Sequence, residues 1–437
     1  MSLAKPSLPV ASAPSTAARP FVHPDAATAG VPEIVPAVVP AGAPLDPGPA
    51  PILTRPFVLL LAMQAAFGFA LSVLVLLPKI LAASFAAKPS QIGVVMAAFG
   101  VASLLSIPFV SRAMVAIDHR RSLMAANLIL AAGILGFLLV NHAGALATVL
   151  RGVHGVAWSL GFAAGMALVA ELAPPARLAQ AIGIFGAASL AMNAIGPAVA
   201  EPLGEAFGYR AIFLLGTASA LGGALLARRW PRLAPMGEGA IDAGVASSAR
   251  AGHGARAGGD EDARRGDQRA IYLVLGFAAL AMGVMFTFLA PFALAHGINA
   301  VRGFFIAYTA SALAVRILVA PFADGIGHRR IARLAAPLYG LTVVAAGLLG
   351  PAHLVILGTG FGTAHGAIFP ALMALLLGGA DRHQRARRVG IANGSMNLGL
   401  ASVFAFGLGA ERLGYATVFI VAGSLMASTT LLLRGRE

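Results

Sequence analysis

The stretch RILVAPFADGIGHRR, residues 316–330, leaves an apolar run through Pro, Asp and Gly and ends in a basic cluster. A related stretch, PFVSRAMVAIDHRR, occupies residues 108–121. Their HRR triplets begin 209 residues apart, about half the length of the 437-residue chain. A chain that avoids charge almost everywhere else therefore places one kind of cluster twice, which predicts that a structural unit is repeated.

The composition indicates a membrane protein. Apolar residues make up 58% of the chain, charged residues 11%, and the mean hydropathy is +0.84. A soluble fold does not hide so much apolar surface, whereas a bilayer removes the need to. The net charge of +14 does not indicate nucleic-acid binding, because the arginines stand in short clusters between apolar runs.

Several kinds of chemistry are not indicated by the sequence. The chain has no cysteine, which excludes disulfides and thiolate metal sites. It has no phosphate-binding loop of the G-x-x-x-x-G-K-[ST] type and no catalytic or metal-ligand motif. We therefore expect no cofactor, no metal and no enzymatic activity.

The apolar runs predict an all-helical integral membrane protein. A spanning helix needs about 20 apolar residues, and lipid offers the backbone no other hydrogen-bonding partner. Twelve spans are predicted: 57–79, 91–111, 122–141, 144–170, 178–200, 211–227, 270–293, 303–322, 331–350, 352–377, 389–408 and 415–433.

Composition also divides the chain. Residues 1–55 carry a proline every few positions and predict a disordered cytoplasmic tail. Residues 228–269, rich in Gly, Ala and mixed charge, predict a flexible cytoplasmic linker. Six-helix bundles are predicted at 56–227 and 270–433, with 434–437 as a cytoplasmic C-terminus.

The basic residues predict the orientation. With the tail in the cytoplasm, 24 of the 31 Lys and Arg residues lie on the cytoplasmic side and Arg316 lies within a span. The six predicted outer ones are Lys79, Lys88, Arg151, Arg210, Arg302 and Arg412. This asymmetry follows the positive-inside rule and places both termini in the cytoplasm; a bacterial inner membrane is the expected location.

The halves repeat further short patterns. HG recurs at 154 and 365, and E-x-x-G-Y-x-x-x-F recurs at Glu205–Phe213 and Glu411–Phe419, offsets of 211 and 206. Each match is weak alone, but their nearly constant offset maps each predicted helix onto the sixth one after it. Parallel repeats of this kind are typical of transporters whose substrate path lies between the halves.

At this point the chain resembles the major facilitator superfamily. The resemblance covers the chain from residue 57 on and rests on the connection after the eighth predicted helix. The family pattern G-x-x-x-D-x-x-G-R-R is matched by Asp324, Gly327, Arg329 and Arg330, with Arg316 and Pro321 upstream. In the first half only Arg120 and Arg121 keep their places, and Asp118 is displaced. The resemblance implies a gating loop at the cytoplasmic face.

The fourth predicted helix also resembles the family. In RGVHGVAWSLGFAAG, Arg151 and Gly155 match the family's R-x-x-Q-G pattern, with His154 in the Gln position. The resemblance implies a role for Arg151 in proton transfer. In the fifth predicted helix the exporter pattern is matched only in part, by Gly183, Gly196 and Pro197, which favours export.

No Asp or Glu stands at the centre of a predicted span, so the usual proton carrier is missing. The coupling candidates are Arg151, His154, His365 and Glu201. The paired histidines could instead line a polar cavity or pack structurally. Arg316 could extend to the interface with Asp324 as its partner, or contact the substrate.

Polar and aromatic residues within the spans are candidates for the substrate cavity. They are Gln64, Trp158, Asn193, Tyr308, Asn393 and Asn397. Amides within spans also join helices to one another, so helix packing is the alternative role for the four amides.

The sequence predicts a monomeric secondary transporter that moves a small molecule by alternating access. Export of an amphipathic or weakly charged molecule is favoured, with protons as the candidate coupling ion. One alternative is an uncoupled facilitator or an importer of a neutral solute. Another is a polytopic membrane enzyme or receptor, which would need clustered catalytic groups and no repeat.

Overall fold

The computed structural model describes residues 51–174, 177–229, 261–319, 322–380 and 382–433. These residues belong to one compact unit, Pro49–Glu437. Residues 1–50 of the predicted tail, 230–260 of the predicted linker and 434–437 lie outside this description, so the boundaries drawn there stay predictions.

The described chain is helical, and twelve of its helical segments are long and apolar enough to cross a membrane, as predicted. The first six spans are α1 (Arg55–Ser72) with η1 (Val73–Leu76) and α2 (Leu77–Phe85), α3 (Pro89–Ala116), α4 (His119–Gly136) with η2 (Phe137–Leu139), α5 (Ala145–Leu172), α6 (Leu178–Phe207) and α7 (Tyr209–Arg228). The second six are α9 (Glu261–Ala295), α10 (Arg302–Val319), α12 (His328–Leu349), α13 (Leu354–Leu377) after η6 (Pro351–His353), α14 (Arg382–Ala401) with α15 (Val403–Leu413), and α16 (Tyr415–Ser428) with η7 (Thr429–Leu433). The short α11 (Ala323–Ile326) precedes α12.

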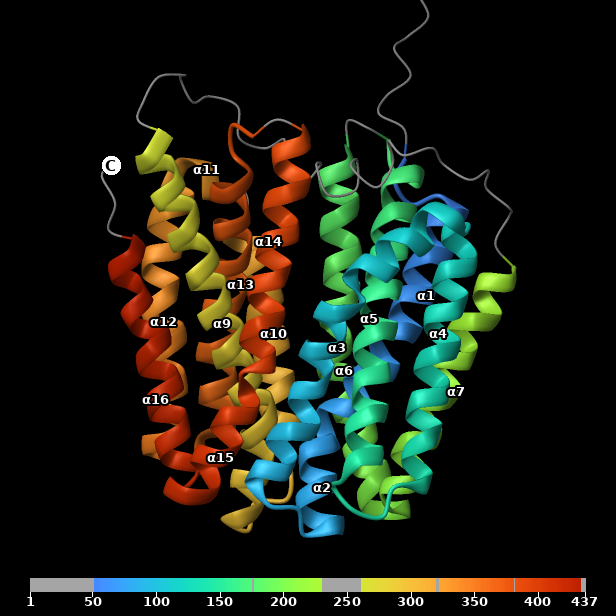
Figure 1. The fold of residues 1–437 in the computed structure, drawn as a ribbon, viewed down its shortest axis with the longest axis vertical. Helices are drawn as coiled ribbons and strands as arrows, with labels where there is room; N and C mark the ends of the chain where they lie inside the picture. Colours follow the sequence, from blue (N-terminus) through green and yellow to red (C-terminus); the bar gives the residue numbers. More distant parts are fainter. Residues whose placement is uncertain (1–50, 175–176, 230–260, 320–321, 381, 434–437) are drawn as a thin grey trace, which may run out of the picture. The chain divides into compact units, whose positions relative to one another are not determined.

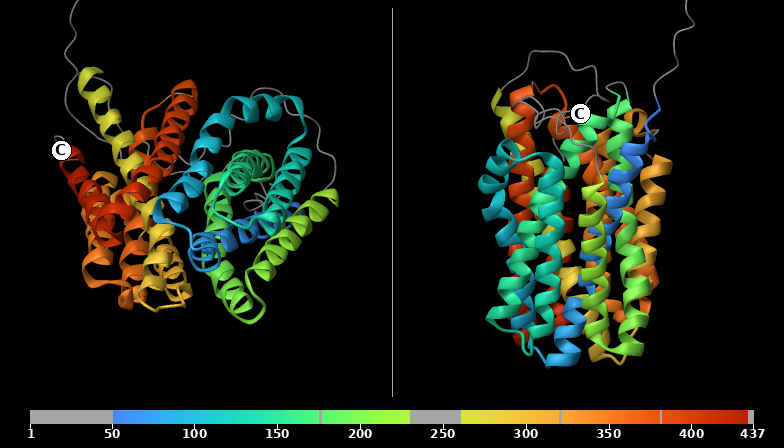
Figure 2. Two further views of the ribbon diagram at one scale, coloured as in Figure 1. Left: turned by 60° about the horizontal axis from the view of Figure 1, so that its bottom comes forward. Right: turned by 90° about the vertical axis from the view of Figure 1, so that its right-hand side faces the viewer.

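The two halves repeat one packing scheme. In the first half α3 packs on α5, α4 on α5 and α7, and α1 on α6. In the second half α10 packs on α13, α12 on α13 and α16, and α9 on α14. Each pair maps onto its counterpart six spans later, which confirms two pseudo-symmetric bundles. Figures 1 and 2 show them side by side, one blue to green and the other yellow to red.

The repeated E-x-x-G-Y pattern marks one tight turn in each half. Gly208 joins α6 to α7 with φ 79° and ψ 167°, and Gly414 joins α15 to α16 with φ 85° and ψ 162°. Positive φ is strained for residues with a Cβ, so glycine lets two spans follow one another without a longer loop. The sequence repeat therefore reflects a repeated backbone conformation.

The first arginine of each HRR triplet, Arg120 or Arg329, contacts a helix that adjoins the long connection between the halves. Arg120 donates from Nε to the carbonyl of Ala227 at 2.7 Å and from Nη2 to that of Arg228 at 3.1 Å, at the C-terminus of α7. Arg329 pairs with Asp267 near the start of α9. The clusters thus anchor the last helix of one half and the first helix of the other.

Some predicted helix ends were wrong. Helix α9 begins at Glu261, inside the predicted linker and nine residues before the predicted span. Its first turns are charged and continue the helix beyond the apolar layer. The first span does not end at Lys79 but continues through η1 and α2 to Phe85. Apolar runs locate the buried part of a helix, not the polar turns that extend it.

The halves meet mainly at one end of the spans, here termed the Lys79 end, where α2 and η1 lie against α9 and α15 lies against α3. Figure 1 shows this end at the bottom, where α2 and α15 are labelled. Helices α3 and α14, and α6 and α10, also pack across the halves. The opposite end, which carries the Asp267–Arg329 pair, is termed the Asp267 end.

Glycine permits the closest of these contacts, and we predict the consequence of filling one. A Cβ at Gly93 would lie 2.9 Å from Cα of Gly407 and 3.2 Å from the carbonyl oxygen of Val403, closer than normal contacts. Gly93→Ala should therefore destabilise the protein by about 1–3 kcal/mol, measured by thermal unfolding in detergent.

The matched control is Gly222→Ala in α7, where a Cβ would meet nothing within 4 Å. Relief of glycine's helix penalty should leave that variant neutral or up to about 1 kcal/mol more stable. Equal effects of the two substitutions would contradict close packing of α3 on α15.

Candidate functional site between the two halves

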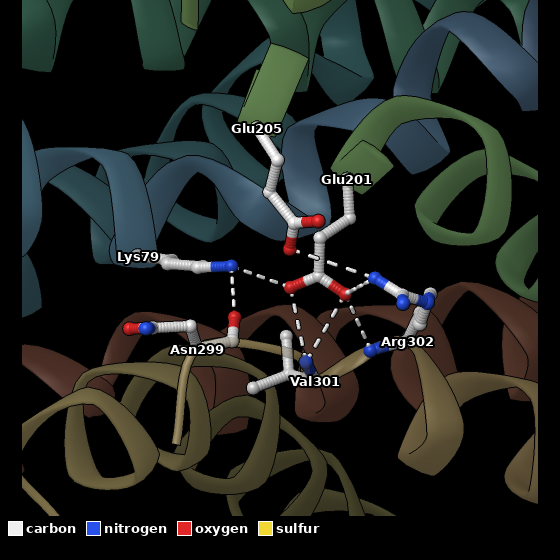
Figure 3. A network of polar contacts seen from close by, with 6 residues as sticks. All are labelled: Lys79, Glu201, Glu205, Asn299, Val301 and Arg302. Carbon is white, nitrogen blue, oxygen red and sulfur yellow. Dashed lines mark hydrogen bonds and ion pairs between the residues drawn. The ribbon is translucent and has the colours of Figure 1, made fainter. Parts of the chain in front are cut away.

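One carboxylate of the first half is buried against the second half at the Lys79 end. Glu201, on α6, is 2% exposed. Its Oε1 lies 2.6 Å from Nζ of Lys79, on α2. It also accepts hydrogen bonds from the backbone amides of Val301, at 3.0 and 3.1 Å, and of Arg302, at 2.8 Å (Figure 3). Three segments far apart in the sequence thus meet on one side chain.

Further charges complete this cluster. Nη1 of Arg302 lies 3.6 Å from Glu201 Oε2 and 3.5 Å from Glu205 Oε1, and Lys79 donates to the carbonyl of Asn299 (Figure 3). We term the six residues Lys79, Glu201, Glu205, Asn299, Val301 and Arg302 the clasp. Its two acids and two bases balance in charge, so the groups satisfy one another rather than drawing in an ion.

Glu201 of the clasp, in the first half, caps the N-terminus of helix α10, which belongs to the second half. The first amides of a helix have no partner within it, and its N-terminus carries partial positive charge. Helix α10 begins at Arg302 after the segment INAV, so no Ser, Thr, Asp or Asn precedes it directly to cap it. Glu201 takes this role instead, and the capping group comes from the other bundle. Separation of the halves at this end would expose the amides and the acid together.

The sequence missed this arrangement. Glu201 was predicted as a coupling candidate, but its pairing with Lys79 and with the start of α10 was not. These partners stand 122 and 100 residues from Glu201 along the chain. Two features of the sequence could have indicated the contact. The start of α10 has no local capping residue, and Glu201 lies near the same predicted membrane face.

The two predicted histidines lie inside their own halves. His154 on α5 is 0% exposed and stacks on Phe137, with ring centroids 5.6 Å apart, while its ring also lies against Gly133. On α13, His365 Nδ1 lies 3.2 Å from the hydroxyl of Tyr339. The positions are equivalent in the repeat, but each histidine packs against neighbours within its own bundle.

Arg151 and Arg316 lie within spans and are half-buried. The guanidinium of Arg151 lies over the ring of Phe99, 4.7 Å from its centroid. In each of the two arginines Nε is buried without a hydrogen-bond partner. The buried Nε of Arg333 on α12 also makes no hydrogen bond, but Nη2 of this arginine donates to the carbonyl of Leu433.

The predicted cavity residues differ in accessibility. Gln64 is 0% exposed and donates to Ser189 Oγ at 2.7 Å, which joins α1 to α6. Tyr308 is 1% exposed and packs among Phe286, Phe304 and Phe361. The others are more accessible: Trp158, Asn193 and Asn397 are half-buried, and Asn393 is exposed. A contact between substrate and any of the six stays a prediction.

The predicted gating loop makes its described contacts within single halves. Arg329 and Arg120 pair as given above, and the side chain of Asp118 accepts from the amide of Arg120 at 3.1 Å. Gly327, with φ 88°, precedes α12. Arg121 and Arg330 are exposed. The side chain of Asp324 and all of Pro321 lie outside the described residues.

We predict that loss of the clasp carboxylate opens the Lys79 end. Val301 is 0% exposed beneath Glu201, and the chain contains no cysteine, so Val301→Cys provides a single reporter. Removing one partner of a buried ion pair costs about 3–5 kcal/mol. Adding Glu201→Gln should therefore raise the rate of labelling by a hydrophilic maleimide by at least about tenfold.

Glu205→Gln is the matched control for this labelling. Glu205 lies on the same helix, its side chain is 47% exposed, and its clasp contact is the 3.5 Å pair with Arg302. Exposed pairs contribute about 0–1 kcal/mol, so labelling should stay near the wild-type rate. Equal acceleration by both substitutions would contradict a specific role for Glu201.

Comparison with known proteins identifies the family. The family model described as Major Facilitator Superfamily matches residues 58–365. The structure is similar to that of the human organic anion transporter MFSD10 (TETRAN), with TM-score 0.60 and 15% identity over 86% of this chain and 98% of that one. It is also similar to a POT family transporter in complex with a thioalcohol-conjugated peptide, with TM-score 0.67 and 12% identity over 86% and 95%.

A third similar structure, from a study of proton-dependent oligopeptide transporters, has TM-score 0.68 and 13% identity over 86% of this chain and 97% of that one. Such low identities show a shared fold and nothing finer. The family model, in contrast, covers more than half of the sequence, and its match agrees with the twelve spans and the repeated bundles. The chain therefore belongs to the major facilitator superfamily.

Proposed function

We propose that this secondary transporter of small molecules exports an amphipathic or weakly charged molecule by alternating access, with protons as the coupling ion. The observation that carries the proposal is the clasp, because Glu201 of the first half accepts from the amides of Val301 and Arg302 of the second half, and these contacts exist only while the Lys79 end is closed. Contacts across the halves are concentrated at that end. At the Asp267 end, the described contacts of the predicted gating loop stay within single halves.

The orientation is part of the proposal. The basic residues favour cytoplasmic termini, which makes the Lys79 end the outer one and this conformation inward-facing. In the opposite conformation the clasp would be broken and the gating loop would join the halves at the cytoplasmic side. A bacterial inner membrane and a monomeric state remain the predicted setting.

Glu201 is the coupling group that we favour. It is the most buried carboxylate among the described side chains. When the Lys79 end opens, Glu201 loses its partners in the second half and meets outer water, where it can bind a proton. A neutral carboxyl no longer attracts Arg302, so the clasp reforms once the proton has passed on toward the cytoplasmic side; a proton returned to the outer water would leave no net proton movement to drive export. The proton-dependent transporters among the similar structures make the proton the first ion to test.

Export is supported by the fifth span, where Gly196 and Pro197 of the partial exporter pattern are buried and a Cβ at Gly196 would collide with Ser72. An uncoupled facilitator or an importer would have the same twelve spans and the same repeat. These alternatives differ from a proton-coupled exporter only in how their flux responds to a pH gradient. The alternative of a membrane enzyme or receptor is set aside, because the family consists of transporters.

The test is flux of a compound panel in everted and right-side-out vesicles. We expect uptake into everted vesicles with an acidic lumen, abolished by an uncoupler. Glu201→Gln should lower gradient-driven uptake at least about tenfold, since removing one partner of a buried ion pair costs about 3–5 kcal/mol. His154→Ala should keep its response to the gradient, because His154 is sealed within the first half.

Arg151→Ala is run beside these variants, and Glu205→Gln is the control on the same helix. Uptake that ignores the pH gradient would favour the facilitator. Undiminished gradient-driven flux in Glu201→Gln would refute Glu201 as the coupling group. Accumulation in right-side-out vesicles alone would refute export.

A further inference from the structure

Two half-buried arginines make no hydrogen bond or ion pair in the described structure, although Arg316 lies within electrostatic range of Tyr308 and His365 of its own half. Arg151 on α5 and Arg316 on α10 make no hydrogen bond or ion pair with any described residue, and Nε of each is buried. Every other partly buried Lys or Arg whose side chain is described has a polar or charged partner. These residues are Lys79, Arg120, Arg177, Arg302, Arg329, Arg333, Arg385 and Arg388.

Arg151 shares one face of α5 with an aromatic pair. Trp158 and Phe162 follow it by 7 and 11 residues, a spacing that places all three side chains on the same side of a helix. The two rings stack, with centroids 5.2 Å apart and planes 27° apart. Phe162 is 37% exposed and Trp158 is half-buried, so the face is accessible.

This face of α5 lies between α3 and α6 of the first half, and Trp158 also stacks on Phe67 of α1, with ring centroids 6.4 Å apart. On one flank Ser159 is hydrogen-bonded to Ser103 of α3 at 2.8 Å. On the other flank Gly165 lies against the ring of Phe185 of α6. Helices α3 and α6 are the two long helices of the first half that pack on α10, α14 and α15. The face between them therefore borders the space between the halves.

Arg316 lies on the side of α10 that also carries Arg302, in the second half. It follows Arg302 by 14 residues and Thr309 by 7 on α10, so the three side chains lie along one side of that helix. Arg302 contacts Glu201 of the first half, which fixes the direction of this side. Thr309 Oγ1, between the two arginines, is also buried without a partner. The second half thus presents unused donors toward the first.

No described acidic side chain balances these two charges. Every described acidic side chain within a span lies within two turns of one end of that span, and none pairs with Arg151 or Arg316. The ring of Phe99 supports the Arg151 cation from its face but accepts none of its in-plane N–H donors. Placing an arginine within a span costs free energy. An arginine whose N–H donors have no described acceptor is suited to bind an anion.

We propose that the transported molecule is an organic anion with an aromatic body. Arg151 and Arg316 bind its carboxylate, and Trp158 with Phe162 stacks its ring. Arg151 is the seventh residue of α5 from the Lys79 end, and Arg316 lies three residues before the opposite end of α10. The arginines therefore serve two stages of one path. Arg316 receives the anion from the Asp267 end, and Arg151 holds it beneath the clasp. The inference rests on the proposed transport function and names its substrate class.

The test uses Trp158 as the reporter, because the chain has two tryptophans and Trp230→Phe leaves only this one. The protein is placed in nanodiscs of phosphatidylcholine and titrated with 4-nitrobenzoate, neutral 4-nitrobenzamide and cationic 4-nitrobenzylamine. We expect saturable quenching by the anion and at least about tenfold weaker binding of the other two. Because this assay measures binding, it is independent of direction and coupling.

Substitution of Arg151 should weaken the anion binding that Trp158 reports. Hydrogen bonds to charged groups correspond to roughly ten- to hundredfold in affinity, so Arg151→Gln should lose about this factor for 4-nitrobenzoate, whereas Arg316→Gln should keep the affinity at Trp158 near wild type and slow the rate of quenching in stopped flow. Arg151→Lys should fall between, because lysine keeps the charge but not the planar donors. Exposed Arg112→Gln on α3 is the matched control and should bind like wild type. Size-exclusion profiles and thermal unfolding verify that each variant is folded.

Several results would overturn the proposal. These are equal or tighter binding of the amide or amine, wild-type affinity in Arg151→Gln, an unchanged rate of quenching in Arg316→Gln, or no saturable quenching by the anion. Loss of anion binding when phosphatidylglycerol is added would assign the arginines to lipid phosphate instead. If binding fails in this way while gradient-driven flux of another compound persists in vesicles, the substrate class is wrong and the proposed function stands.

Discussion

A carboxylate of one bundle that completes a helix terminus of the other is the contact on which the conformation depends. Helix α10 starts with amides that have no local cap, and Glu201 supplies the acceptor from α6. Lys79 of the same bundle and Arg302 of the other bundle balance its charge, and the contacts with Arg302 and with the amides of α10 exist only while the bundles touch. The remaining contacts across the halves include the more exposed pair of Lys88 with Glu411 and close glycine contacts such as that of Gly93 with Gly407. The clasp gives one end of the transporter a defined closed state.

The sequence repeat reflects two mechanical requirements. Gly208 and Gly414 permit the same abrupt turn in each half. Arg120 and Arg329 hold the helices on either side of the long connection, one through carbonyls at the C-terminus of α7 and the other through Asp267 of α9. Equivalent arginines have thus taken different partners in the two halves. The displaced Asp118 fits this divergence, because it caps its own helix rather than pairing with a neighbouring helix.

Much of the fold could be predicted because lipid leaves so few choices. Twelve apolar runs give twelve helices, and a constant offset gives two bundles. The polar turns of α9 and the extension of the first span past Lys79 were missed, since hydropathy marks burial in lipid and not helix length. The clasp was missed because its partners are distant in sequence. Sequence reasoning named Glu201 and Arg151 as coupling candidates, a role that stays a prediction, but it could not find their surroundings.

The most direct test of the account measures the distance between the halves at the Lys79 end. Spin labels at Ser84→Cys in α2 and Ala352→Cys in η6, both exposed, report it by pulsed electron resonance in the otherwise cysteine-free chain. With Glu201 intact we predict one dominant short distance. With Glu201→Gln we predict a large added population at longer distance. An unchanged distance distribution in Glu201→Gln would contradict the claim that this carboxylate holds the halves together.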